Sequence, residues 1–122
     1  MNIGTDIVNI DRIRQVLAQQ GDRFVRRILT RAEQDEYQRR GAPVKFLANR
    51  FAGKEAIAKA LGTGIAQGVT FQGIEILPDA NGAPKAQLFG AAQEKQRSLG
   101  ADQVHISLAD ELDYVVAFAV LA

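Results

Sequence analysis

The longest helical pattern in the sequence is PVKFLANRFAGKEAIAKAL, residues 43–61. Large apolar residues recur along it at helical spacing, with small alanines between them. These apolar residues are Phe46, Leu47, Phe51, Ile57 and Leu61. Gly62-Thr63-Gly64 follows and ends the pattern, because glycine readily adopts the left-handed conformation that closes a helix. We therefore predict one long helix, around which the rest of the chain is arranged.

Strands and shorter helices are predicted on both sides of this helix. Before it we expect a strand from Ile3 to Asn9, a helix from about Ile10 to Gln20, a short basic helix capped by Asp22 and running through Leu29, and a helix to about Arg40 opened by the capping box Thr30-Arg31-Ala32-Glu33. After it we expect strands Thr70 to Leu77 and Lys85 to Phe89 joined at Asn81-Gly82, a helix from about Ala91 to Leu99, and strands Val104 to Leu108 and Tyr114 to Leu121. The last strand is largely apolar and is expected to be buried. A helical cluster between strands predicts an α+β fold.

The length and composition are those of one globular domain, residues 1–122, with 47% hydrophobic and 24% charged residues. No apolar run approaches the roughly 18 residues of a membrane-spanning helix. The first residues, from Met1 to Asp6, include neither a basic leader nor a cleavable apolar segment, so no export signal is expected. The absence of cysteine excludes disulfides, thiolate metal sites and a cysteine nucleophile, and it suits a cytoplasmic protein.

The charges are unevenly distributed along the chain, although the net charge is only +1. The basic residues of the amino-terminal part are Arg12, Arg14, Arg23, Arg26, Arg27 and Arg31, opposed within that segment only by Asp22. The acids of the last part are Asp102, Asp110, Glu111 and Asp113, with no lysine or arginine among them. The basic segment is either an ordinary solvated surface or a face that attracts an acidic partner.

Two acids lie where an unpaired carboxylate is costly. Asp6 is inside an apolar strand, on the same face as Gly4 and Val8, and Glu55 is in the middle of the long helix. Two carboxylates from different elements, completed by phosphate oxygens and waters, form a common type of Mg²⁺ site. The alternative is that Glu55 pairs with Lys59 one turn later and Asp6 faces water at a strand end.

Other residues have both a binding and a purely structural interpretation. Gly62-Thr63-Gly64 offers backbone N–H groups and a hydroxyl to a phosphate, or simply stops the helix. Arg50 and Lys54 are one turn apart and either reach a polyphosphate together or form a solvated face. His105, the only histidine, alternates with apolar residues and is expected to face water or a site rather than the core.

Taken together, these segments resemble the holo-acyl-carrier-protein synthase family, the small phosphopantetheinyl transferases. The matching stretches are Ile3-Gly4-Thr5-Asp6-Ile7-Val8 with Arg12-Ile13, Arg27-Ile28-Leu29-Thr30, Arg50-Phe51-Ala52-Gly53-Lys54-Glu55-Ala56, Lys59-Ala60-Leu61-Gly62-Thr63-Gly64-Ile65, Ile74-Glu75-Ile76, Asn81-Gly82-Ala83-Pro84 and His105-Ile106-Ser107-Leu108-Ala109-Asp110-Glu111. They cover nearly the whole chain in the family's order.

The resemblance implies an antiparallel sheet packed against a long central helix. It also implies an activity: transfer of the 4′-phosphopantetheine of coenzyme A to a serine of apo-acyl carrier protein, releasing 3′,5′-ADP, in fatty acid biosynthesis. Asp6 and Glu55 would bind Mg²⁺, and Lys59 would stabilise charge on the phosphate. Glu55, directly or through a metal-bound water, would take the serine proton.

The resemblance further implies a homotrimer that binds coenzyme A between subunits, with no nucleic acid or membrane as partner. The implied coenzyme contacts are Arg50, Lys54, Gly62, Thr63, Gly64 and His105, and the implied docking residues for the acidic carrier are Arg12, Arg23 and Arg27. Two positions depart from the family pattern. Asn9 replaces a glutamate that many relatives have, and Ala109-Asp110 stands where many relatives have a histidine.

Two other functions remain open at this point. One is a module that binds coenzyme A or a nucleotide without catalysing its conversion. The other is an RNA-binding protein that uses the arginines between Arg12 and Arg31, although Phe24 is the only aromatic residue there for base stacking.

Overall fold

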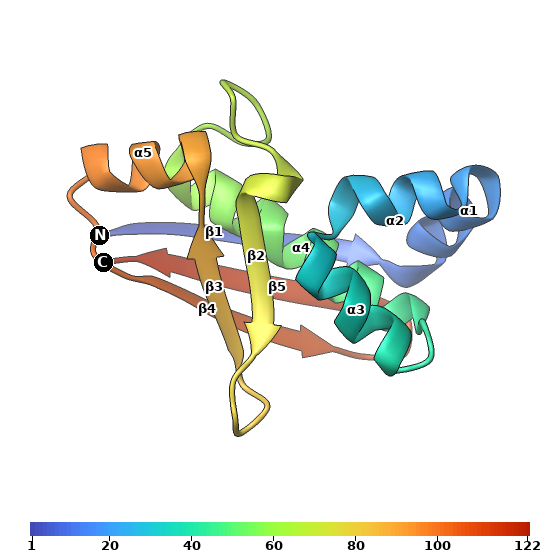
Figure 1. The fold of residues 1–122 in the computed structure, drawn as a ribbon. Coiled ribbons are helices and arrows are strands. Elements are labelled where there is room, and N and C mark those ends of the chain that lie inside the picture. Colours follow the sequence, from blue (N-terminus) through green and yellow to red (C-terminus); the bar gives the residue numbers. More distant parts are fainter.

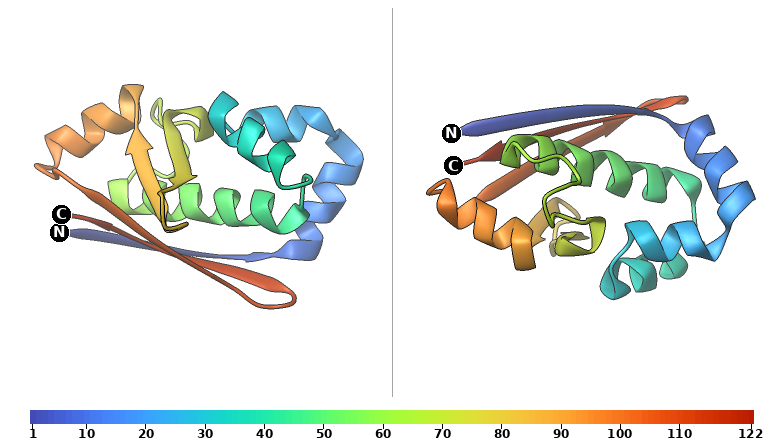
Figure 2. Two further views of the ribbon diagram at one scale, coloured as in Figure 1. Left: turned by 60° about the horizontal axis from the view of Figure 1, so that its bottom comes forward. Right: turned by 90° about the horizontal axis from the view of Figure 1, so that it is seen from above.

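The computed structural model describes residues 1–122 and places helix α4, Val44–Leu61, in the middle of the molecule (Figure 1). A three-stranded antiparallel sheet covers one side of α4, in the order β1 (Asn2–Asn9), β5 (Tyr114–Leu121), β4 (Val104–Asp110). A two-stranded hairpin of β2 (Ile74–Pro78) and β3 (Pro84–Leu88) lies on the other side, as Figure 2 shows. The predicted α+β fold, with an antiparallel sheet against a long helix, is confirmed.

Five further segments complete the outer layer, and the two chain ends lie next to each other at one end of the sheet (Figure 1). They are α1 (Ile10–Gln20), α2 (Asp22–Ile28), α3 (Arg31–Arg39), the 3-10 helix η1 (Phe71–Gly73) and α5 (Gly90–Ser98). The first three follow β1 directly and form one end of the molecule (Figure 2). No helix of the structure combines the length and the apolar character that crossing a membrane requires.

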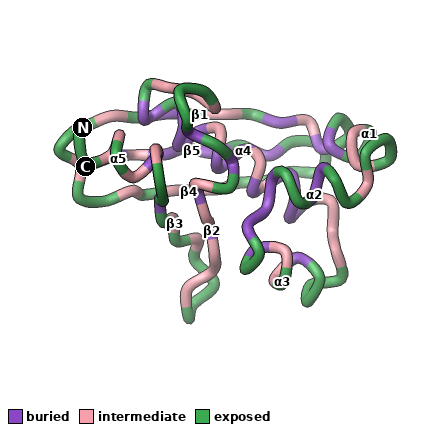
Figure 3. Tube along the Cα trace, turned by 45° about the horizontal axis from the view of Figure 1, so that its top comes forward, coloured by how far each residue is buried: buried purple, intermediate pink, exposed green.

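Helix α4 is buried on nearly all sides because it lies between two layers (Figure 3). Its small residues allow the close approach of β1. A Cβ atom added to Gly4 would lie 2.1 Å from the carbonyl oxygen of Ala56 and 2.6 Å from the backbone nitrogen of Ala60. Strand β1 therefore packs on α4 at a distance that only glycine allows at this position.

The three-stranded sheet has one covered face and one open face. Gly4, Asp6 and Val8 are on the face toward α4, as the alternation in the sequence predicted. The opposite face exposes large apolar side chains, namely Ile3, Ile7, Tyr114, Val116 and Phe118. The prediction that the last strand is buried is thus wrong for every second residue, because nothing in the single chain covers the outer face.

Helix starts were mostly predicted correctly, with one exception. Asn9 caps α1, since its Oδ1 accepts a hydrogen bond from the N–H of Asp11, and Thr30 with Glu33 forms the predicted capping box of α3. Asp22 does not cap α2; it is the first helical residue, and Gly21 occupies the cap position without a side-chain bond. The correction follows from Gly21, whose positive φ reverses the chain one residue earlier than the sequence suggested.

The strand predicted from Thr70 to Leu77 begins later than expected. Thr70 instead caps η1, with its side chain accepting a hydrogen bond from the N–H of Gly73, and β2 begins at Ile74. This local side-chain bond competes with strand pairing, which explains the difference. The hairpin after β2 is confirmed, and its turn is closed by Asp79, whose Oδ1 accepts hydrogen bonds from the N–H groups of Asn81 and Ala83.

Candidate functional site

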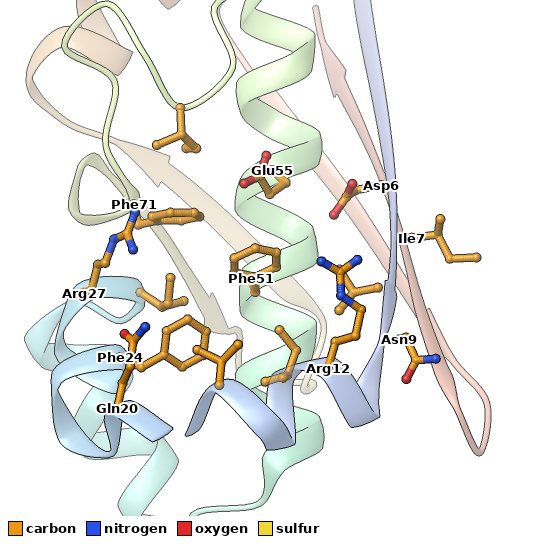
Figure 4. A pocket seen from close by; sticks show the side chains of 15 residues that line it. Asp6, Ile7, Asn9, Arg12, Gln20, Phe24, Arg27, Phe51, Glu55 and Phe71 are labelled. Atoms are coloured by element: carbon orange, nitrogen blue, oxygen red, sulfur yellow. The ribbon is translucent and has the colours of Figure 1, made fainter. Parts of the chain in front are cut away.

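A cavity of about 620 Å³ opens where β1, α1, α2 and α4 meet, and both predicted acids line it. Asp6 comes from β1 and Glu55 from α4. Figure 4 shows the Asp6 side chain extending from β1 toward α4, on which Glu55 lies. Both acids therefore line one cavity, and their joint binding of a metal stays a prediction.

Local packing brings the two acids together. Asp6 is two residues after Gly4, so both are on the strand face that meets α4. Glu55 immediately precedes Ala56, the residue whose carbonyl Gly4 approaches most closely. The contact between Gly4 and Ala56 thus holds the two backbone segments that carry these acids close together.

Glu55 is half-buried, and its pKa is raised above the ordinary value. The largest cause is burial, which disfavours the ionised form, and the second is the negative charge of Asp6; Lys59 opposes both. A bound cation would reverse the effect of Asp6 and favour the ionised form of Glu55. The site therefore favours a positive charge between the two acids.

Lys59 interacts with Asp6 rather than with Glu55. Its Nζ lies 3.1 Å from Oδ1 of Asp6 and donates to the backbone oxygen of Thr5 at 3.0 Å. The alternative in which Glu55 simply pairs with Lys59 is not what the structure contains. The Lys59 side chain is 51% exposed, so its ion pair is weakly stabilising and leaves the ammonium free to meet a phosphate.

The residues present fit a magnesium ion that is bound jointly with a substrate. No group of three or more histidine, cysteine or acidic side chains is present that would hold a metal by protein ligands alone. Two carboxylates that line one cavity with room for phosphate oxygens and water are a usual donor set for Mg²⁺. The donor chemistry at Asp6 and Glu55 therefore suits Mg²⁺ with a polyphosphate.

One wall of the cavity is aromatic, which the sequence analysis missed. Phe51 lies between Phe24 and Phe71, with ring centroids 6.4 Å and 5.4 Å away (Figure 4). A signal was present in the sequence, because Phe51 is one helical turn before Glu55 and so shares its face of α4. The site thus combines a charged side with an apolar side.

Two of the three predicted docking arginines reach this cavity. Arg12 extends from α1 toward Asp6, and Arg27 extends from α2 toward Phe71 (Figure 4). Arg23 is exposed on α2 and does not line the cavity. The mouth of the cavity is therefore basic, next to the two acids.

The structure corrects two of the predicted coenzyme contacts. Lys54 is fully enclosed, and its Nζ donates to three protein oxygens, so it has neither surface nor a free N–H for a ligand. Arg50 is 5% exposed, donates from Nε to the carbonyl of Ile76, and stacks on Phe46 at 4.3 Å. Burial lowers the pKa of Arg50 to about 10. Both were predicted either to reach a polyphosphate or to form a solvated face, because the sequence does not reveal that α4 is covered on two sides.

The remaining predicted coenzyme contacts lie outside the cavity. In the segment Gly62-Thr63-Gly64, the N–H groups of the glycines donate to Lys59 and Ala58, and the Thr63 hydroxyl donates to Gly64. These groups close the helix, as the structural interpretation predicted. His105 is exposed, as expected, on the outer face of β4, away from the side of the sheet on which Asp6 lies.

The two positions that depart from the family pattern have structural roles. Asn9, which lines the cavity, is the cap of α1. Asp110 pairs with Lys45 at 3.4 Å near the end of β4. Neither adds a third acid beside Asp6 and Glu55.

Comparison with known proteins gives a consistent result. The family model described as "4′-phosphopantetheinyl transferase superfamily" matches residues 2–119. The chain is 50% identical over 121 residues to a holo-[acyl-carrier-protein] synthase of Shewanella amazonensis, covering 99% of this chain and 97% of the relative. It is 48% identical over 121 residues to the enzyme of the same name from Photorhabdus laumondii, covering 99% and 96%.

Solved structures agree with the sequence relatives. The crystal structure of holo-[acyl-carrier-protein] synthase from Neisseria meningitidis has a TM-score of 0.90 at 45% identity, covering 99% of this chain and 97% of that one. The Helicobacter pylori enzyme, crystallised in complex with coenzyme A, has a TM-score of 0.87 at 28% identity, covering 98% and 99%.

Proposed function

The chain belongs to the 4′-phosphopantetheinyl transferase superfamily, and from this premise we propose that it transfers the phosphopantetheine arm of coenzyme A to a serine of apo-acyl carrier protein. The products are holo-carrier protein and 3′,5′-ADP. The observation that carries the proposal is that the carboxylates of Asp6 and Glu55, from two different elements, line the same cavity. The similarity to an enzyme crystallised with coenzyme A supports the choice of donor.

Asp6 and Glu55 would hold Mg²⁺, which when bound neutralises charge on the diphosphate of coenzyme A and aligns it. Lys59, already beside Asp6, is placed to stabilise negative charge that develops on the phosphate. The serine hydroxyl must lose a proton as it attacks phosphorus. Glu55, which lines the cavity, would accept it, directly or through a water.

The experiment that tests this function is a mass measurement. Apo-carrier protein, coenzyme A and Mg²⁺ incubated with the protein should give a carrier that is heavier by one phosphopantetheine. Addition of EDTA should abolish the gain. Coenzyme binding without any mass gain would instead identify a binding module, and a salt-dependent shift of RNA without carrier binding would identify an RNA-binding protein.

We place the carrier at the basic mouth of the cavity, formed by Arg12 and Arg27, and on Arg23, which is exposed on α2 outside the cavity. Arg12→Glu should raise the KM for the carrier about tenfold or more, because it replaces attraction for an acidic partner by repulsion. The KM for coenzyme A should change less than twofold, since its diphosphate would be held through Mg²⁺ by Asp6 and Glu55 rather than by a side chain of α1. Steady-state kinetics with each substrate varied in turn will test this. Equal changes in both KM values would contradict a separate docking face.

We also propose that the protein is a homotrimer that binds coenzyme A between subunits. The open face of the sheet supports an interface, because it presents contiguous apolar side chains such as Ile7, 64% exposed, and Phe118. His105 lies on this same face, where it would contact a coenzyme bound by a neighbouring subunit.

Replacing Phe118 by aspartate should break this assembly, because a charge buried in an apolar interface is costly. Light scattering should give three times the chain mass for the unmodified protein and the monomer mass for the variant. Ser107→Asp is a useful comparison. Ser107 in β4 is the cross-strand partner of Phe118 and lies beside it on the same face, so this substitution should weaken the same interface. A variant of Phe118 that keeps the original mass would exclude this face.

A further inference from the structure

A buried ion pair lies directly beneath the cavity. Lys54 and Glu33 have no exposed side-chain surface, and Nζ of Lys54 lies 2.6 Å from Oε1 of Glu33. Two charges removed from water in this way require both a partner and further hydrogen bonds. The pair is not part of the reacting groups, and it takes its partners from several elements.

Lys54 connects α4 to two other segments. Besides Glu33, its Nζ donates to the carbonyl of Ile28 at 2.6 Å and to the carbonyl of Phe71 at 2.9 Å. Ile28 is the last residue of α2 and Phe71 the first of η1. An ammonium group has three N–H donors, and here each of them has a different segment as its acceptor.

Glu33 completes the network on the other side. Its Oε1 also accepts from the N–H of Thr30, and its Oε2 accepts from the N–H of Ile76 at 2.7 Å. The carboxylate therefore joins the start of α3 to strand β2. Together the two charges fasten four segments to α4 through hydrogen bonds that have no competition from water.

The segments held by Lys54 are walls of the cavity. Ile28 and Phe71 both line it, and α2 also carries Arg27 at its mouth. Lys54 itself is adjacent in sequence to Glu55. One side chain thus links the helix that supplies the acid to the wall that would receive the carrier protein.

We propose that the Lys54–Glu33 pair is a positioning device, which sets the α2 and η1 wall of the cavity at the correct distance from Glu55 for the carrier serine. This inference rests on the proposed function. Lys54 and Glu33 touch neither substrate; they act through Ile28, Phe71 and Arg27. Stability alone is a poor reason for the pair, because an apolar pair of similar volume generally stabilises a core at least as well.

An exposed residue makes a second connection at the same junction. Nε2 of Gln72, in η1, donates to the carbonyls of Arg26 and Leu29 at the end of α2, at 2.5 Å and 2.6 Å. Because Gln72 is exposed, its removal loosens the same wall without disturbing the core.

The test combines a double variant with a surface variant. Lys54→Met together with Glu33→Gln removes both charges at once, so neither is left buried alone. We expect the folded double variant to bind apo-carrier protein about tenfold more weakly and to show a similar rise in carrier KM, with the KM for coenzyme A changed less than twofold. Gln72→Ala should give a two- to threefold loss in the same direction, and Gln87→Ala, exposed on β3, should give none.

Carrier binding is measured by fluorescence anisotropy of labelled apo-carrier protein without coenzyme A, so that it does not depend on catalysis. A folded double variant with unchanged carrier affinity and carrier KM would overturn the inference. If the double variant does not fold, Gln72→Ala decides: unchanged carrier affinity overturns the inference, and a selective loss supports it. A wild-type protein that binds the carrier but transfers nothing would contradict the proposed function alone.

Discussion

Replacing Asp6 by alanine is expected to lower kcat/KM for carrier modification at least about 1000-fold, because the loss of one of two carboxylates removes both the metal site and its alignment of the donor. Glu55→Gln should have an equally large effect on product formation while affecting coenzyme affinity far less. Both side chains line the cavity, whereas Asp11, the next acid after Asp6 in the sequence, is an exposed residue of α1 paired with Arg14.

The measurement is the rate of mass gain of the carrier at saturating Mg²⁺, with Asp11→Ala as the matched control. Binding of Mg²⁺ in the presence of 3′,5′-ADP, followed by calorimetry, gives a second readout that does not depend on turnover. Asp6→Ala should lose that binding, and Asp11→Ala should keep it. An Asp6→Ala protein with an unchanged rate would mean that the metal ligand has been misassigned.

Replacing Gly4 by alanine is expected to destabilise the fold by about 3 kcal/mol, because the added methyl group overlaps main-chain atoms that have no room to move. The Cβ position lies 2.1 Å from the carbonyl oxygen of Ala56 and 2.6 Å from the nitrogen of Ala60. Strand β1 must move away from α4 to remove this overlap, and that movement carries Asp6 away from Glu55. The variant should therefore lose activity as well as stability.

Urea unfolding at constant temperature measures the change, and Gln87→Ala is the control. Gln87 is exposed on β3, outside both the contact of β1 with α4 and the open face of the sheet. It should unfold with a free energy within about 0.5 kcal/mol of the original protein. A Gly4→Ala protein as stable as Gln87→Ala would show that the strand and helix can separate at little cost.

Local patterns in the sequence account for most of the helices and strands. The alternation in β1 correctly placed Asp6 on the same face as Gly4, and the Thr30–Glu33 capping box was found because all its atoms lie within one helical turn. The wrong predictions concern the burial of side chains. In these cases the presence or absence of a segment distant in sequence decides whether the side chain is covered. Phe118 was predicted to be buried, yet the single chain leaves its side of the sheet open.

The sequence alone singled out Asp6 and Glu55 as candidates, because an acid within an apolar strand and an acid in the middle of a long helix are local features that motifs record. Only the tertiary structure decided that both line one cavity, since this depends on the close packing of Gly4 against Ala56. The tertiary structure also decided that Lys54 is a buried residue hydrogen-bonded within the protein rather than a ligand contact. The burial of Lys54 results from segments 17 to 26 residues away in sequence folding over α4, which no local pattern specifies.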